Sequence, residues 1–285
     1  MVFFYFLIGI IVLSVLFLLI MMQGFKNTKK SHNKTPDEFG LPFNEIWIPT
    51  KNHRNLYAWW IPAETECTDT PPTLILVHGW NRNVERMMAY IKKLQPLGYN
   101  LLAFDSRNHG NSDGDSFSSM IKFAEDIHAT VNYLEHHPCV NHDKLGVIGL
   151  SIGGAASIYA ASLDKRIKKV ITVGAFARPD DVMAILFKKR HIPYFPFVWA
   201  LFKYIEFRIG AKFDEISPVN NINKSPAEFL LIHGTDDKTV PYKQAEKLIA
   251  AANPDKSELF TLPGRGHSDC HKYPGFWDKV EGFLI

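Results

Sequence analysis

The sequence predicts an α/β fold, in which helices cover both faces of a mostly parallel sheet. Short apolar runs of strand length alternate with longer segments of helical periodicity along most of the chain. The run at 145–150 passes through a Gly-x-Ser-x-Gly turn into small residues that suit a helix. Two later runs end in loops that carry an acidic pair and a histidine. The length of 285 residues suits one large domain with a short extension.

The composition is that of a globular protein with a sizeable core, since 46% of the residues are hydrophobic and 21% are charged. The net charge of +3 is small, and the chain has no basic stripe or nucleic-acid-binding motif, which argues against a nucleic-acid partner. Cys67, Cys139 and Cys270 are scattered along the chain. They predict neither a disulfide framework nor a metal site, and they favour a reducing compartment.

Residues 1–22 form an apolar stretch without a charged side chain. As a helix it would rise about 33 Å, enough to cross a bilayer core. No basic residue precedes it and no small-residue cleavage pattern follows it, so the stretch predicts an uncleaved transmembrane anchor rather than a signal peptide. By the positive-inside rule, the lysines that follow predict a single-pass membrane protein whose C-terminal domain faces the cytoplasm: Lys26, Lys29, Lys30 and Lys34.

Residues 23–42 are mainly polar and rich in lysine, which predicts a juxtamembrane linker before a domain at 43–285. Two interpretations of the linker remain open. It is either a solvated tether or a basic segment that lies against anionic headgroups.

Eight strands are predicted. The first two are rich in tryptophan and flank a turn at 51–54, and most of the later ones are apolar throughout, as buried parallel strands are. In chain order the strands are 44–49, 55–62, 73–78, 99–105, 145–150, 168–173, 228–233 and 258–262. Helical patterning follows at 84–97, 118–137, after the Gly-x-Ser-x-Gly turn, at 242–252 and at 276–283.

Ser151 is the candidate nucleophile. It lies between a buried strand and a helix, where a tight turn would expose its hydroxyl group. Such a turn leaves no room for side chains two residues before and after the serine, and Gly149 and Gly153 occupy those positions. A serine that only caps the following helix is the alternative for this turn taken alone.

A serine nucleophile needs a base, and the base needs an acid to orient it. The loop after the strand at 228–233 carries Asp236 and Asp237, and the loop after the last strand carries His267. Catalytic groups collect at the carboxyl edge of parallel strands, so Ser151, Asp237 and His267 are expected to meet there. Asp236 is an alternative acid, and two weaker candidates follow the strand at 168–173: Asp180 and Asp181.

An oxyanion hole requires two convergent backbone N–H groups. One is expected from Ile152, directly after the serine, and the other from Trp80, in the loop after the strand at 73–78. His78 precedes the serine in the chain, which is the wrong order for the base, and it is expected to brace this loop.

Five motifs together resemble the α/β-hydrolase superfamily over about 44–285. They are His-Gly-Trp at 78–80, the loop at 104–112 with Asn108 where glycine is usual, the turn at 149–153, the His-Gly-x-x-Asp-x-x-Val-Pro loop at 233–241 and Gly-His at 266–267. The resemblance favours Asp237 over Asp236. It implies an α/β-hydrolase fold and a serine hydrolase similar to membrane-anchored bacterial esterase-like proteins, Bem46-like proteins and prolyl-oligopeptidase-type domains.

The resemblance also implies a helical lid at about 175–226, a segment rich in aromatic residues. These rings either line an apolar acyl pocket or pack the lid onto the core. The expected activity is carboxylesterase, lipase or thioesterase chemistry (EC 3.1) on a small acyl substrate of apolar, lipid-like character, with neither a metal nor an organic cofactor. A serine peptidase and a non-catalytic membrane-tethered scaffold are the alternatives.

Overall fold

The centre of the molecule is an eight-stranded sheet with the order β1-β2-β4-β3-β5-β6-β7-β8. The computed structural model describes residues 27–64 and 71–285, together with single helical positions between 4 and 22. The predicted anchor at 1–22 therefore lies largely outside the described residues. No helix among the residues that are described is both long and apolar enough to span a membrane.

The predicted eight-stranded, mostly parallel sheet is confirmed. β1 and β2 form an antiparallel hairpin, β2 pairs antiparallel with β4, and the remaining neighbours are parallel. The strands are β1 (Asn44–Thr50), β2 (Arg54–Ile61), β3 (Thr73–Val77), β4 (Asn100–Phe104), β5 (Leu145–Leu150), β6 (Lys169–Val173), β7 (Glu228–Gly234) and β8 (Ser257–Leu262).

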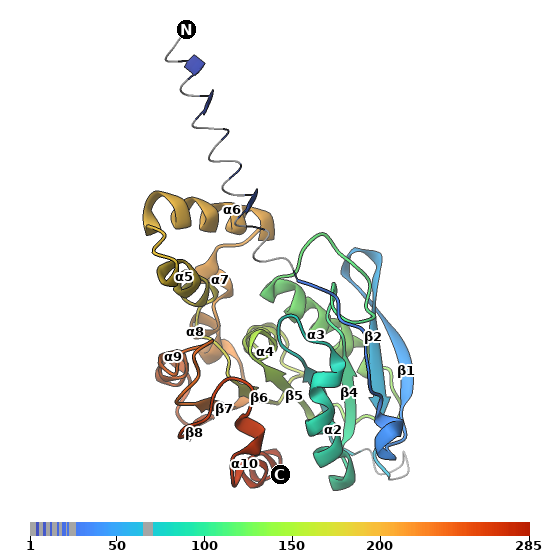
Figure 1. The fold of residues 1–285 in the computed structure, drawn as a ribbon. Coiled ribbons are helices and arrows are strands. Elements are labelled where there is room, and N and C mark those ends of the chain that lie inside the picture. Colours follow the sequence, from blue (N-terminus) through green and yellow to red (C-terminus); the bar gives the residue numbers. More distant parts are fainter. Residues whose placement is uncertain are drawn as a thin grey trace.

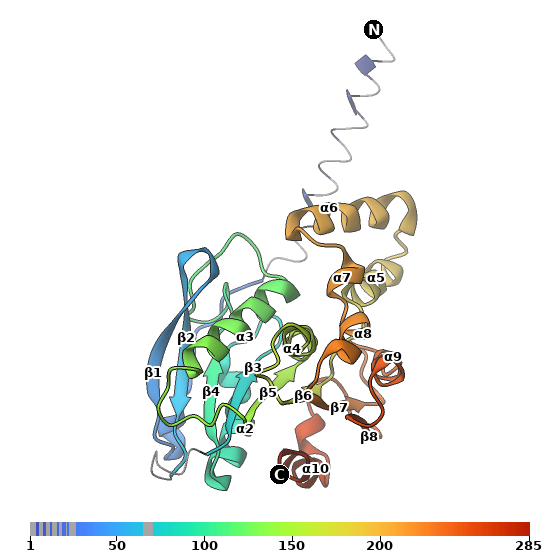
Figure 2. The same cartoon turned by 180° about the vertical axis from the view of Figure 1, so that it is seen from behind.

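Helices cover both faces of the sheet (Figures 1 and 2). Side chains alternate along each strand, so that Ile75 and Val77 of β3 join the core under α3 and α4, and Leu74 and Leu76 join the core under α2 and α10. The helices that flank the sheet are α2 (Met88–Leu94), α3 (Met120–Leu134), α4 (Ile152–Leu163), α9 (Lys243–Ala251) and α10 (Phe276–Leu284).

The helix predicted at 84–97 is broken into three pieces. A 3-10 turn, η4 (Val84–Met87), leads into α2, and a second 3-10 turn at Gln95–Leu97 ends at Gly98 in the left-handed region. Pro96 cannot continue an α-helix, because it lacks the N–H group. Apolar periodicity alone does not distinguish these turn types.

A helical insertion separates β6 from β7. It contains α5 (Pro179–Lys189), the turn at Tyr194–Val198, α6 (Trp199–Ile209), α7 (Phe213–Ile216) and α8 (Pro218–Asn221). In both views α6 lies at the far end of the insertion, beside the N-terminal end of the chain (Figures 1 and 2).

Cys139 is disulfide-bonded, a pairing that the positions of the three cysteines in the sequence did not indicate. Pairing requires two Cα atoms about 4.4–6.8 Å apart, a tertiary distance that spacing along the chain does not reveal. Cys270 is free and buried.

Candidate active site

Ser151 lies at the turn between β5 and α4 in a strained backbone conformation, with φ 55° and ψ −120°. Non-glycine residues rarely adopt this region, and such strain is typical of functional sites. A Cβ atom added at Gly149 would lie 2.5 Å from the carbonyl oxygen of Gly153, and one added at Gly153 would lie 2.5 Å from that of His78. The close approach of these backbones explains why both positions are glycine.

His267 and Asp237 come from the loops after β8 and β7, and they are hydrogen-bonded to each other. His267 Nδ1 lies 2.6 Å from Asp237 Oδ2. The second carboxylate oxygen, Oδ1, accepts the backbone N–H groups of Thr239 and Val240, each at 2.8 Å. These bonds fix the carboxylate and leave the other ring nitrogen of His267, Nε2, available for proton exchange.

Asp237 is ionised at neutral pH. Burial opposes its charge, but hydrogen bonds with His233 and His267 outweigh this effect and hold the pKa of the Asp237 carboxyl well below its usual range. His233 Nε2 lies 2.8 Å from the Val240 carbonyl and 3.5 Å from Asp237 Oδ2. The sequence placed His233 in a motif but did not show this second contact to the carboxylate.

Ser151 and His267 line one cavity of about 310 Å³. They make no hydrogen bond to each other among the contacts of the described chain. Apolar and polar residues line the cavity: Gly79, Trp80, Arg82, Arg86, Tyr90, Leu150, Ser151, Val173, Thr239, His267, Ser268, Cys270 and His271.

Two backbone amides are available beside Ser151. Ile152 is the first residue of α4, so its N–H group has no acceptor within the helix. Trp80 follows Gly79, where an added Cβ would lie 3.5 Å from the Ser151 Cβ. Neither amide has an acceptor among the hydrogen bonds of the described residues. An unfilled pair of donors next to a serine hydroxyl suits a developing oxyanion.

His78 braces the loop that carries Trp80. Its Nδ1 lies 2.7 Å from the Gly79 carbonyl, and its Nε2 lies 3.0 Å from the Ser106 amide nitrogen. Complete burial lowers the pKa of His78, so the ring is neutral and accepts the Ser106 N–H. This agrees with a supporting role for the residue.

The other acidic candidates lie in different contacts. Asp236 accepts a hydrogen bond from the Thr235 hydroxyl and is exposed. Asp180 pairs with Arg178 at 2.9 Å, and Asp181 forms an ion pair with Lys247. Of the four candidate acids, Asp237 is the one in contact with His267.

The loop after β4 is fixed beneath the site by hydrogen bonds to two buried charged residues, Asp105 and Arg107. Asp105 accepts the N–H groups of Val84 and Asn111 at 2.6 Å and 2.8 Å. Arg107 is 1% exposed, and its Nε donates to Asp126 at 2.7 Å. A buried guanidinium needs such a partner, since an unpaired buried charge costs several kcal/mol.

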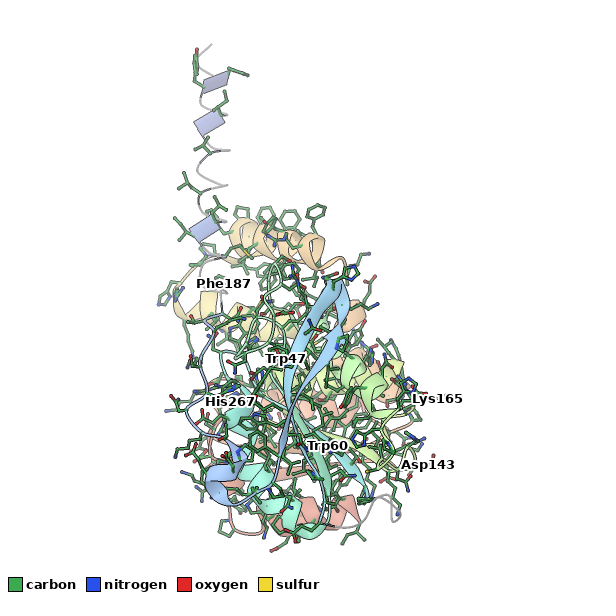
Figure 3. All side chains as sticks on the ribbon, turned by 90° about the vertical axis from the view of Figure 1, so that its right-hand side faces the viewer. Trp47, Trp60, Asp143, Lys165, Phe187 and His267 are labelled. Atoms are coloured by element: carbon green, nitrogen blue, oxygen red, sulfur yellow. The ribbon has the colours of Figure 1, made fainter. Side chains whose placement is uncertain are left out.

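The aromatic rings of the lid segment do not line this cavity in the part of the chain that the structure describes. Phe195 and Phe207 are 71% and 82% exposed. In Figure 3 one row of α6 side chains projects away from the domain, and Phe187 is labelled between α6 and His267. Phe187 and Phe202 are buried in the core cluster, so part of the ring set packs the insertion onto the domain.

The described residues include no cluster of three or more histidine, cysteine, aspartate or glutamate side chains that could hold a metal ion. The thiol of Cys270 lines the cavity, but burial raises its pKa to about 11. The thiolate form needed for nucleophilic attack is therefore rare at neutral pH.

The site also contains residues that the sequence motifs did not indicate. Arg82, Arg86, Tyr90 and His271 line the cavity. Arg82 precedes η4, Arg86 lies in η4, Tyr90 lies in α2 and His271 lies in the short turn η8 (Cys270–Lys272), which meets the other three only after folding. Their spacing in the sequence carries no signal for a shared site.

Comparison with known proteins agrees with this fold. A profile of the alpha/beta hydrolase fold family matches residues 72–211. The chain is 25% identical over 265 residues to the uncharacterized membrane protein YNL320W of Saccharomyces cerevisiae, covering 92% of this chain and 85% of that protein. It is 25% identical over 268 residues to the protein bem46 of Schizosaccharomyces pombe, covering 93% and 84%.

Among solved structures, the chain is similar to an esterase of Pyrococcus furiosus, with a TM-score of 0.73 and 25% sequence identity. The alignment covers 91% of this chain and 98% of that chain. The strand order, the strained serine turn, the family profile and these relatives agree, and the chain belongs to the α/β-hydrolase superfamily.

Proposed function

We propose that the protein is a serine hydrolase that cleaves a carboxylic ester or a related acyl bond through an acyl-enzyme intermediate. The observation that carries this proposal is the 2.6 Å bond between His267 and Asp237 at the cavity that Ser151 lines. The similarity to the Pyrococcus furiosus esterase supports the same reaction class.

The residues divide the reaction as follows. His267 removes the proton from the Ser151 hydroxyl, and Ser151 Oγ attacks the acyl carbon. The N–H groups of Trp80 and Ile152 stabilise the oxyanion. His267 then gives the proton to the leaving alkoxide, so that the acyl–oxygen bond breaks. Water, deprotonated by His267, releases the acid and restores Ser151. Asp237 orients His267 and stabilises its charged form.

The apolar wall of the cavity, with Leu150, Val173 and Trp80, supports an apolar acyl chain next to Ser151. The sequence suggested that aromatic rings at about 175–226 line an acyl pocket. We propose that Leu150, Val173 and Trp80 contact the acyl chain instead. The cavity of about 310 Å³ suits a small acyl substrate.

The test is labelling by a fluorophosphonate probe, which phosphonylates an activated serine. The full-length protein is expected to be labelled, and Ser151→Ala is expected to lose all labelling. Ser157→Ala is the matched control, since Ser157 is a buried serine of α4 that donates to the Gly153 carbonyl. Labelling that persists in Ser151→Ala contradicts the assignment, and a wild-type protein that is neither labelled nor active on acyl esters supports the scaffold alternative.

We also propose that residues 1–22 anchor the enzyme in a membrane. The described apolar positions between 4 and 20 are exposed, among them Phe4, Leu16 and Ile20 at 63%, 50% and 64%. The neighbouring helix α6 presents exposed rings as well, and the similar yeast protein is named a membrane protein. An anchor there would place the cavity close to lipid-derived acyl substrates.

A further inference from the structure

Two arginines stand in the wall of the cavity that holds Ser151. Arg82 lies just before η4, close to Trp80 in the chain, and Arg86 lies within η4. Arg82 is exposed and Arg86 is half-buried. A guanidinium group presents up to five N–H donors, so the pair forms a dense set of donors for an anion.

Neither guanidinium has a carboxylate partner among the described residues. Arg86 Nη2 donates at 2.7 Å to the Ser268 carbonyl, and the Arg82 side chain forms no hydrogen bond or ion pair with the described residues. By contrast, four other arginines form ion pairs with carboxylates: Arg107, Arg166, Arg178 and Arg265.

The acidic residues closest in sequence are already engaged. The Glu85 carboxylate accepts the Asn33 N–H at 3.1 Å, and the Asp269 carboxylate accepts the Gly266 N–H at 2.8 Å and faces Arg265. Burial, then Arg86 and Lys272, lower the pKa of His271, which adds a neutral ring to the same wall. Because no carboxylate of the described residues forms an ion pair with Arg82 or Arg86, both guanidinium groups can pair with an anion in the cavity.

We infer that this cavity takes an acyl substrate bearing an anionic group, a carboxylate or a phosphate, which Arg82 and Arg86 bind while Ser151 attacks the acyl carbon. This inference rests on the proposed serine hydrolase. The apolar wall receives the chain and the arginines receive the charge, so the substrate is amphipathic. Arginine suits this role because its planar donors match both carboxylate and phosphate geometry.

Two p-nitrophenyl esters with six-carbon acyl chains test the inference on the full-length protein in detergent. The hexanoate ester is neutral, and the adipate monoester carries a terminal carboxylate. We expect the ratio of kcat/KM, adipate to hexanoate, to fall roughly tenfold or more in the double variant Arg82→Gln/Arg86→Gln. The ratio is expected to stay near the wild-type value in Arg54→Gln, which removes an exposed arginine outside the cavity.

Arg86→Lys separates charge from shape, because it keeps the charge and loses the planar donors; it is expected to keep part of the preference for adipate. A ratio in the double variant equal to that of the wild type overturns the inference. Adipate and hexyl phosphate, as competitive inhibitors of hexanoate hydrolysis, distinguish the two anion types. Stronger inhibition by either one than by uncharged hexanol supports the site, and equal inhibition by all three overturns it.

Failure of the proposed function gives a different pattern. If neither ester is hydrolysed and no probe labels Ser151, the hydrolase assignment fails. Calorimetric binding of adipate and hexyl phosphate to Ser151→Ala still tests the anion site under that outcome. Binding that weakens roughly tenfold when Arg82→Gln and Arg86→Gln are added supports the site. Unchanged or absent binding overturns it.

Discussion

The backbone of Ser151 lies in a region that costs a non-glycine residue roughly 1–3 kcal/mol. The turn persists because Ser151 N–H donates at 2.9 Å to the Val173 carbonyl of the neighbouring strand, and because Gly149 and Gly153 leave room for close backbone contact. These local requirements are written in residue types, which is why a single sequence identified the turn. The carboxylate that contacts His267 was also predicted, because the resemblance of the loop after β7 to the family motif favoured Asp237 over Asp236.

At the residue scale, Asp237→Asn is expected to lower kcat on an acyl ester roughly 10³- to 10⁴-fold. An amide cannot stabilise the charged form of His267, and its NH2 group does not accept the Nδ1–H. Steady-state hydrolysis of p-nitrophenyl hexanoate measures the effect, and Asp236→Asn is the matched control because that carboxylate contacts Thr235 instead. A loss of similar size in both variants would contradict the assignment of the acid.

At the scale of an element, the segment at 27–39 lies along the domain rather than free in solvent. The Thr28 N–H donates at 3.1 Å to Asn81 Oδ1, and the Asn83 side chain donates to the carbonyls of Lys30 and Ser31 at 3.2 Å and 3.1 Å. Asn81 and Asn83 border the loop that carries Trp80 and Arg82. The segment that leads from the predicted anchor therefore contacts a wall of the active site.

His32 fastens this segment to the buried loop after β4. Its Nε2 lies 2.8 Å from Asp105 Oδ2. Burial of Asp105 opposes its ionisation, but the hydrogen bonds with His32 and with the Asn111 N–H outweigh it and lower the pKa of the carboxyl. The contribution of Asp105 to the free energy of unfolding is therefore complete above its ordinary pKa of about 3.9. It is lost as the pH falls from there through the folded-state pKa.

His32→Ala is expected to lower the free energy of unfolding by about 1–3 kcal/mol at pH 7, because a buried carboxylate loses one of its partners. The difference from the wild type should shrink as the pH falls below about 4, where Asp105 becomes protonated. Denaturant unfolding of the full-length protein in detergent measures both effects. His142→Ala, which removes an exposed histidine, is the control. The prediction is contradicted if His32→Ala has the free energy of unfolding of the wild type and unchanged protection of the 27–35 amides from hydrogen exchange.

At the scale of the whole molecule, one sheet brings together loops from four parts of the chain, and the N-terminal stretch extends from the side where α6 lies (Figures 1 and 2). If residues 1–22 form an anchor, the full-length protein is expected to stay in the membrane pellet after alkaline carbonate extraction. Val12→Arg/Leu16→Arg is expected to shift it to the supernatant, because each arginine costs about 2.5–3.5 kcal/mol at the centre of a bilayer.

Leu163→Arg is the matched control for this extraction, since Leu163 is 62% exposed on α4 of the domain. Release of the wild-type protein by carbonate would contradict the anchor. Protease accessibility of the domain in sealed vesicles measures its orientation. The lysines after the stretch predict a cytoplasmic domain, whereas a disulfide at Cys139 is typical of an oxidising compartment.

The sequence by itself determined the order of the strands along the chain, the strained turn at Ser151, and the positions of Asp237 and His267. Each of these depends on residue type, local periodicity or spacing within one loop, which a chain displays without folding. Only the tertiary structure decided which side chains share the cavity. Arg82 and Arg86 lie far from Ser151 in the sequence, and His271 lies far from all three. They meet because the sheet brings its loops to one edge. The same holds for the His32–Asp105 contact and the disulfide at Cys139, since contacts between distant residues depend on how the elements pack, and no local pattern records that packing.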